Sequence, residues 1–105
     1  MQSYYCIFAM RDDQIDLVFK AFAHSERRRI LKSLDRRPDQ SLFEICASSF
    51  AETGLTNSRQ TISQHLDMLE RAGLIRTAWK GRTKIHSLDR KRLRAAIETA
   101  VELNP

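Results

Sequence analysis

Apolar side chains recur every three or four residues through the first two thirds of the chain, which is the period of an amphipathic α-helix. The pattern predicts four helices, over residues 12–23, about 25–37, about 41–53 and 57–73. Polar residues suited to capping stand at their starts: Asp12 or Asp13, Ser25, Ser41, and Asn57 or Ser58. The inward faces are expected to comprise Ile15, Val18, Phe19 and Phe22, then Ile30, Leu31 and Leu34, then Leu42, Ile45, Cys46 and Phe50, and finally Ile62, Leu66 and Leu69.

The pattern changes after Gly73, which ends the fourth helix. Two short strand-like runs, 74–78 and 83–88, flank the segment from Trp79 to Arg82. A connection of this length that contains a glycine favours a β-hairpin. We expect Trp79 to pack underneath this hairpin.

A last helix is predicted over residues 89–103, with Asp89 as its cap. Its apolar face comprises Leu93, Ala96, Ile97, Ala100 and Val101. The predicted order is α-α-α-α-β-β-α, mainly α with a small β-hairpin wing (α+β), which is the order of a winged helix-turn-helix domain. The length of 105 residues suits a single domain, 1–105, in which residues 1–11 form an extension or a tail.

The chain carries a net charge of +5, and its distribution is uneven. Residues 1–56 contain equal numbers of acidic and basic side chains, so residues 57–105 supply the whole excess. The second half is therefore the part expected to face a polyanion, although a solvated basic surface has the same composition. The sequence has no secretory leader and no apolar run of about 18 residues, so we expect a cytoplasmic protein without membrane contact.

The fourth predicted helix combines a buried seam with a polar outer face. At about 100° per residue, Leu66 and Leu69 fall on the same side as Ile62. The first two turns of the outer face carry side chains that can read bases in the major groove: Arg59, Gln60, Thr61, Ser63 and Gln64. Any exposed helix face is polar, but this clustering directly after a turn favours nucleic-acid contact. Residues 57–73 are thus the predicted recognition helix.

The predicted hairpin, residues 74–88, is basic. Ser58 before the helix and the cations of the hairpin are expected to contact the DNA backbone or the minor groove: Arg76, Lys80, Arg82 and Lys84. The alternative is a solvated hairpin end.

A run of three arginines, Arg27, Arg28 and Arg29, opens the second predicted helix. Positive charges at a helix start oppose the helix dipole. The run is expected either to contact phosphates or to form salt bridges, or else to be a solvated face.

Three segments resemble a known family. The stretch VFKAFAHSERRRIL resembles the first two helices of ArsR-type regulators, SRQTISQHLDMLERAGLI their recognition helix, and WKGRTKIHSL their wing. The resemblance implies a homodimeric bacterial repressor that binds a palindromic operator in double-stranded DNA and is released by an inducer. His65 also matches a position where the family often has histidine, and its angle near the buried edge suggests a structural role.

The same resemblance implies that the first and last helices, 12–23 and 89–103, form the dimer interface. The residues expected there are Ile15, Val18, Phe19, Phe22, Leu93, Ala96, Ile97, Ala100 and Val101.

The chain departs from the metal-sensing members of that family. Ser41 and Phe43 stand where a Cys-x-Cys pair would bind a thiophilic metal, and residues 89–105 contain no histidine. Because a transition-metal site needs about four converging ligands, we expect no metal and no cofactor.

Three other classes of function have sequence signatures of their own. No nucleophile with a neighbouring base and no glycine-rich phosphate loop is recognisable, so an enzyme is not expected. A redox-sensing regulator acting through Cys46 or Cys6 stays open, since a reactive thiol needs a lowered pKa and access that a sequence does not reveal. A winged helix that binds protein instead of DNA also stays open, although such domains usually lose the basic face.

Overall fold

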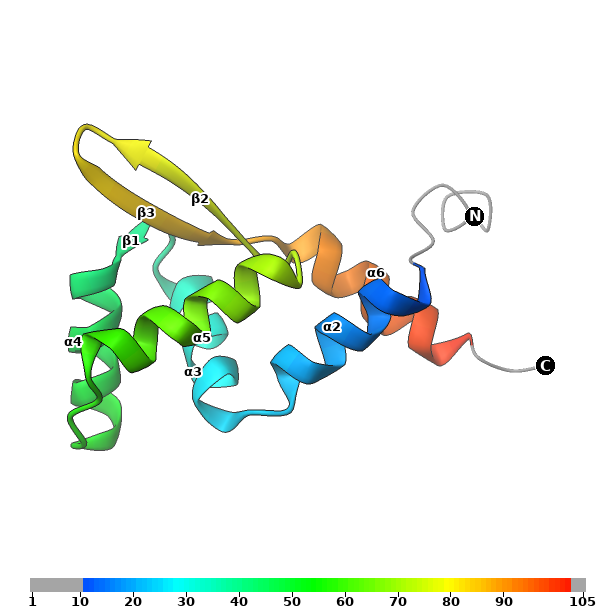
Figure 1. The fold of residues 1–105 in the computed structure, drawn as a ribbon, viewed down its shortest axis with the longest axis horizontal. Helices are drawn as coiled ribbons and strands as arrows, with labels where there is room; N and C mark the ends of the chain where they lie inside the picture. The colour runs from blue at the N-terminus through cyan, green and yellow to red at the C-terminus, as the bar shows by residue number, and fades with distance from the viewer. Residues whose placement is uncertain (1–10, 103–105) are drawn as a thin grey trace.

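The computed structural model describes residues 11–102. In chain order the elements are α2 (Asp12–Phe22), α3 (Ser25–Arg36), β1 (Gln40–Ser41), α4 (Leu42–Thr53), α5 (Arg59–Arg71), β2 (Ile75–Lys80), β3 (Thr83–Leu88) and α6 (Arg90–Val101). The predicted fold class, mainly α with a small β-hairpin, is confirmed. Figure 1 shows α4 and the hairpin tip at one end of the molecule and α6 at the other. No helix among the described residues is long and apolar enough to cross a membrane.

The two-residue strand β1 is absent from the predicted order. It pairs with β3 in the antiparallel sheet β1-β3-β2, with Gln40 opposite His86. The side chain of Gln40 is buried and donates from Nε2 to the carbonyl oxygens of Ser33 and Arg37, at 3.1 and 2.7 Å. The buried His86 ring contacts the Gln40 carbonyl through Nδ1, at 3.0 Å. Two residues are too few to show a strand period, so this pairing left no sequence pattern.

The predicted caps are partly right. Ser58 and Asp89 accept hydrogen bonds from the backbone N–H groups of Thr61 and Arg92, as expected. The cap of α3, however, is His24 and not Ser25, because His24 Nδ1 accepts from the N–H of Glu26 at 3.2 Å. The imidazole nitrogen thus accepts the hydrogen bond that a Ser or Asp oxygen usually accepts at a helix cap.

Likewise, α2 begins after Arg11, whose N–H donates to the Gln14 side chain, whereas Asp12 and Asp13 lie in the first turn. Carboxylates in a first turn suit the positive end of the helix dipole without serving as the cap.

The core is formed by residues from the four helices α2 to α5, the connection from α5 to β2, the start of β2 and one residue of α6. It comprises Val18, Ala21, Ile30, Leu31, Leu34, Ile45, Ile62, Leu66, Leu69, Ala72, Leu74, Ile75 and Ala96.

Two residues of the predicted inward faces are exposed: Phe19 of α2 at 47% and Phe50 of α4 at 55%. In α4 the neighbour Ser49 is buried instead of Phe50. The cause is the buried Glu26 of α3, whose Oε2 accepts a hydrogen bond of 2.7 Å from Ser49 Oγ. A buried carboxylate left without a donor is costly, so α4 turns its hydroxyl inward and its phenyl ring outward.

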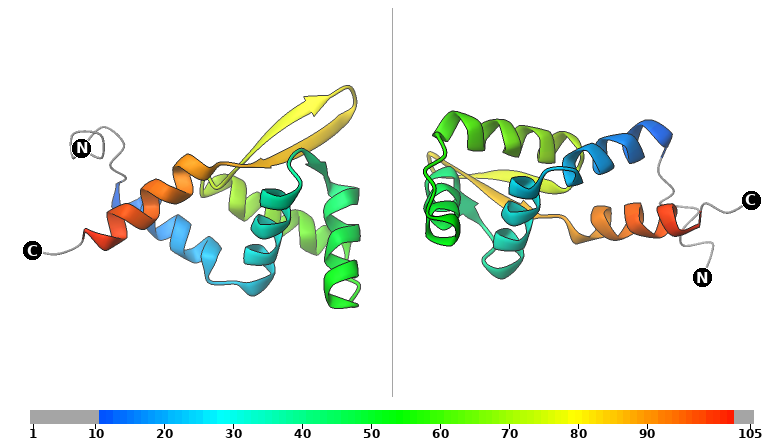
Figure 2. Two further views of the ribbon diagram at one scale, coloured as in Figure 1. Left: turned by 180° about the vertical axis from the view of Figure 1, so that it is seen from behind. Right: turned by 90° about the horizontal axis from the view of Figure 1, so that it is seen from below.

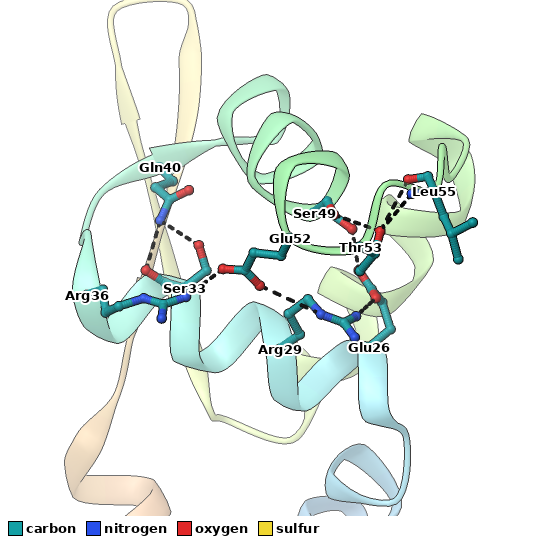
Figure 3. A network of polar contacts seen from close by, with 9 residues as sticks. All are labelled: Glu26, Arg29, Ser33, Arg36, Gln40, Ser49, Glu52, Thr53 and Leu55. Carbon is teal, nitrogen blue, oxygen red and sulfur yellow. Dashed lines mark hydrogen bonds and ion pairs between the residues drawn. The ribbon is translucent and has the colours of Figure 1, made fainter.

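Figure 3 shows the polar network that joins α3 to α4 around this contact. Arg29 forms ion pairs with Glu26 and, at 3.7 Å, with Glu52. Arg36 Nη2 lies 2.5 Å from the other carboxylate oxygen of Glu52. The network fixes α4 against α3 and assigns Arg29 to salt bridges, which was one of the two expected uses of the arginine run.

The hairpin is tighter than predicted. Its strands pair from Ile75 opposite Leu88 to Lys80 opposite Thr83, leaving Gly81 and Arg82 as a two-residue turn. Gly81 has a φ of 64°, which a glycine adopts without strain. We call this hairpin, residues 75–88, the wing.

The prediction that Trp79 packs underneath the hairpin is wrong, since its side chain is 69% exposed. The wing extends beyond the sheet partner β1, which pairs only with Ile85 and His86. No core element therefore reaches far enough along the wing to cover the indole.

Candidate nucleic-acid interface

The helix-turn-helix consists of α4, a connection from Gly54 to Ser58, and α5. Gly54 ends α4 in a left-handed conformation, with a φ of 71°, and its N–H donates to the Phe50 carbonyl at 2.8 Å. The buried seam of Ile62, Leu66 and Leu69 anchors α5 to the core as predicted from its spacing. The helix itself is shorter than the predicted range of 57–73, because it starts after its cap and ends at Arg71.

All five residues predicted to read bases are exposed on the first two turns of α5: Arg59, Gln60, Thr61, Ser63 and Gln64. One of them, Thr61, is tied to the helix cap Ser58, because Ser58 Oγ accepts from the Thr61 N–H at 3.0 Å and donates to Thr61 Oγ1 at 2.8 Å. The Ser58 hydroxyl is therefore occupied as a cap, whereas the Thr61 hydroxyl still has its own proton to donate.

The four wing cations are all exposed, but they do not share one surface. Successive side chains on a strand point to opposite faces. Lys84 lies opposite Trp79 on the face that also carries His86, whereas Arg76 and Lys80 belong to the other face. Arg76 lies at the base of the wing, 3.6 Å from the Asp89 carboxylate.

A groove of about 480 Å³ separates the wing from α5. It is lined by Ser41, Leu42 and Phe43 at the start of α4, by Arg59, Ser63, Leu66, Asp67 and Glu70 of α5, and by Trp79, Arg82, Thr83, Lys84 and His86 of the wing. The structure thus brings together four of the predicted DNA-contacting residues, Arg59, Ser63, Arg82 and Lys84. Arg76 and Lys80 do not line this groove.

Three residues, Arg27, His65 and His24, join α5 to the end of α2. Arg27 donates to the carbonyl oxygens of Lys20 and Ala21, both at 2.9 Å, and its Nη1 lies 3.3 Å from His65 Nδ1. The rings of His65 and His24 are 4.5 Å apart between centroids. Burial lowers the pKa of His65 from its ordinary value of 6.5, with smaller contributions from His24 and Arg27. The sequence indicated a structural His65 but gave no sign of the Arg27 contact.

Helices α2 and α6 carry the residues predicted for the dimer interface, and two of those predictions are corrected. Val18 and Ala96 are fully buried in the core of a single chain, so they have no surface to offer a second copy. Ile15, Phe22, Leu93 and Ala100 are half-buried. Three side chains stand out into solvent: Phe19, Ile97 and Val101, at 47, 48 and 77% exposure.

Two other kinds of site, a metal site and a reactive cysteine, can be checked in residues 11–102. In that range no three His, Cys, Asp or Glu side chains are grouped so that they could hold a metal ion. Cys46 is half-buried, and burial raises the pKa of its thiol despite the opposing charge of Arg59. A raised pKa lowers the thiolate fraction on which redox reactivity depends. Cys6, the other candidate for redox sensing, lies outside the described residues.

Residues 24–77 match the family model described as bacterial regulatory protein, arsR family. An uncharacterised HTH-type transcriptional regulator of Bacillus subtilis, YuzN, is 32% identical over 87 residues, covering 83% of this chain and 95% of the relative. An ArsR-like transcriptional regulator from Rhodococcus sp. RHA1 superposes with a TM-score of 0.69 at 31% identity, covering 87% of this chain and 79% of that one. A second ArsR family regulator, at 23% identity, shares the fold with a TM-score of 0.73 over 90% of each chain.

Proposed function

The chain belongs to the ArsR family of bacterial regulatory proteins and is a DNA-binding transcription regulator, and from this premise we propose that it is a homodimeric repressor of a palindromic operator. The observation that carries the proposal is the juxtaposition of an uncovered polar helix face with a basic groove. Arg59 and Ser63 of α5 lie across that groove from Arg82 and Lys84 of the wing.

In this function α5 enters the major groove and its first two turns read base edges. Gln60 and Gln64 offer the paired donor and acceptor that adenine presents, and Arg59 offers the fork that guanine accepts. Thr61 and Ser63 contribute hydroxyls to bases or phosphates. Arg82 at the wing tip reaches the adjacent minor groove, where cations are favoured.

The other wing cations and Ser58 act less directly. Arg76 and Lys80 supply positive charge toward the backbone from the outer face of the wing, and Ser58 serves DNA binding by starting α5 at the right residue.

The dimer is proposed to form through α2 and α6. Figures 1 and 2 show the start of α2 and the whole of α6 at the end of the molecule away from the wing tip. The exposed Phe19, Ile97 and Val101 supply the apolar surface, which the half-buried Ile15, Phe22, Leu93 and Ala100 extend. An isologous contact there places two recognition helices on the same side of one duplex, which suits two-fold symmetric half-sites.

The repressor is proposed to work in the cytoplasm as a single domain, without a metal or cofactor. Ser41 and Phe43, which supply no thiolate for a metal, and the raised pKa of Cys46 support a signal other than metal or oxidant at those positions.

Selection of bound duplexes from a random pool tests this function. We expect two inverted half-sites with centres about one helical turn apart, or a multiple of that spacing. A salt titration supplies the second measurement, because phosphate neutralisation makes affinity fall steeply between about 50 and 200 mM salt. An affinity that stays flat over this range, or a pool that yields no enriched duplex, would favour a protein-binding winged helix instead.

A further inference from the structure

Trp79 is the only tryptophan of the chain, and the reading of bases by α5 makes no use of it. It lies on β2 opposite Lys84, and both line the groove between the wing and α5. Phe43, which is 74% exposed at the start of α4, lines the same groove. Two aromatic side chains left in solvent beside a basic surface indicate an apolar contact that the chain alone does not make.

The proposed function indicates which part of a DNA duplex would lie in the groove between the wing and α5. Major and minor grooves alternate along B-DNA, and one sugar-phosphate strand separates each pair of neighbours. If α5 occupies a major groove and the wing tip the adjacent minor groove, that strand must cross the space between α5 and the wing. The groove lined by Arg59, Arg82 and Trp79 is this space.

The chemistry of the groove fits a strand of alternating phosphates and sugars. Arg59, Arg82 and Lys84 provide charge for phosphates, and Ser63 adds a hydroxyl donor. The faces of Trp79 and Phe43 fit the apolar edge of a deoxyribose.

Acidic side chains limit the path of such a strand. Asp67 and Glu70 line the groove along the second half of α5, and Glu70 accepts a hydrogen bond from Thr77 Oγ1 at 3.1 Å. Because carboxylates repel phosphates, the strand is confined to the first half of α5, beside Arg59 and Ser63.

We propose that Trp79 and Phe43 are the apolar walls of a channel for one sugar-phosphate strand of DNA, with the Trp79 indole packed against a deoxyribose. The proposal rests on the proposed function and adds a contact that is independent of sequence. Trp79 thereby contributes affinity to every duplex alike, because the sugar is the same at each position.

The single tryptophan allows a direct test by intrinsic fluorescence of the intact chain. Because the indole is exposed, we expect acrylamide to quench it efficiently in the free protein. We expect a saturating duplex to protect it, whether the duplex is one recovered by selection or an unrelated one of equal length at low salt. As a control, Trp79→Phe combined with Phe50→Trp moves the only indole to an exposed position on α4 that does not line the groove, where DNA is expected to give no such protection.

Affinity measurements complete the test. Trp79→Ala is expected to weaken binding about tenfold for both duplexes, because roughly half of the indole surface would be buried against the DNA and is lost in the variant. Trp79→Phe is expected to retain most of the affinity. Equal quenching with and without bound DNA, or unchanged affinity of Trp79→Ala, would overturn the channel while leaving the proposed function standing. A loss confined to one base position would overturn it in favour of base reading by Trp79. Failure of the unmodified chain to bind any duplex would refute both proposals.

Discussion

Arg27 and His65 lie in contact, with Arg27 Nη1 3.3 Å from His65 Nδ1, and this pair joins the end of α2 to α5. The same guanidinium holds two carbonyl oxygens at the end of α2. Since α2 is the proposed dimer helix and α5 the proposed reading helix, the pair connects the two functional ends of the chain.

Replacing Arg27 by alanine should therefore destabilise the protein. The Lys20 and Ala21 carbonyls would lose a charged donor, and we expect a cost of about 1–2 kcal/mol, discounted for partial exposure. Arg27→Lys should recover part of the loss, because one ammonium can reach some of these acceptors but lacks the planar fork. Urea unfolding measures both variants. Equal stability of Arg27→Ala and the unmodified chain would show that the contacts carry no net stabilisation.

His65 predicts a pH dependence of stability. Its pKa is lowered in the folded protein, so the unfolded chain binds a proton first as the pH falls. Above the ordinary value of 6.5 both states are neutral and the histidine adds no pH dependence; below it, the folded state loses stability until the pH reaches the lowered pKa. His65→Gln should flatten this part of the curve. Urea midpoints between about pH 7.5 and 5 provide the measurement, and an identical slope in the variant would contradict the prediction.

The helices were predictable because their signal is local. The seam of Ile62, Leu66 and Leu69 follows from spacing alone. Gly54, at the end of α4, indicates by its residue type the left-handed conformation that ends this helix. The fold class and the exposed face of α5 followed from these features.

What sequence could not provide depends on contacts distant along the chain. Phe50 was expected inside because it is apolar, but the buried Glu26, 23 positions away from Ser49, selects the hydroxyl instead. The pairing of β1 with β3 and the exposure of Trp79 likewise depend on where separate segments meet.

The two kinds of DNA contact should respond differently to mutation. Gln64→Ala is expected to cost about 1–3 kcal/mol of binding free energy and to relax the preference at one base position, because its amide is proposed to read a base edge. Arg82→Ala should weaken binding to all sequences alike and reduce the salt slope by about one. Titrations of the selected duplex and its single-base variants at several salt concentrations separate the two. If Arg82→Ala changed affinity only for substitutions at one base pair, the assignment of Arg82 to the DNA backbone or minor groove would be wrong.

The proposed dimer surface predicts that a charge at Phe19 blocks association. Phe19→Asp places a carboxylate in the apolar contact of α2 and α6, so we expect monomers and a loss of operator affinity. Phe50→Asp is the matched control, since Phe50 is similarly exposed but lies on α4. Sedimentation equilibrium reports the mass of each variant. Dimers that persist in Phe19→Asp, or that dissociate equally in Phe50→Asp, would place the interface elsewhere.

The network between α3 and α4 predicts that its two carboxylates, Glu26 and Glu52, contribute differently to the free energy of unfolding. Glu26 is buried and accepts from Ser49, so Glu26→Ala leaves that hydroxyl and Arg29 short of a partner inside the protein. We expect a loss of about 2–3 kcal/mol in the free energy of unfolding. Glu52→Ala removes contacts at the surface and should cost less than about 1 kcal/mol.

Urea unfolding of the two alanine variants under the same conditions makes the comparison. Arg29 pairs with both Glu26 and Glu52, so each single variant leaves it one of these partners and the double variant leaves it neither. The double variant should therefore lose more unfolding free energy than the sum of the two single losses. Additive losses would mean that Arg29 does not couple the two carboxylates, and equal single losses would mean that burial of Glu26 does not set its contribution.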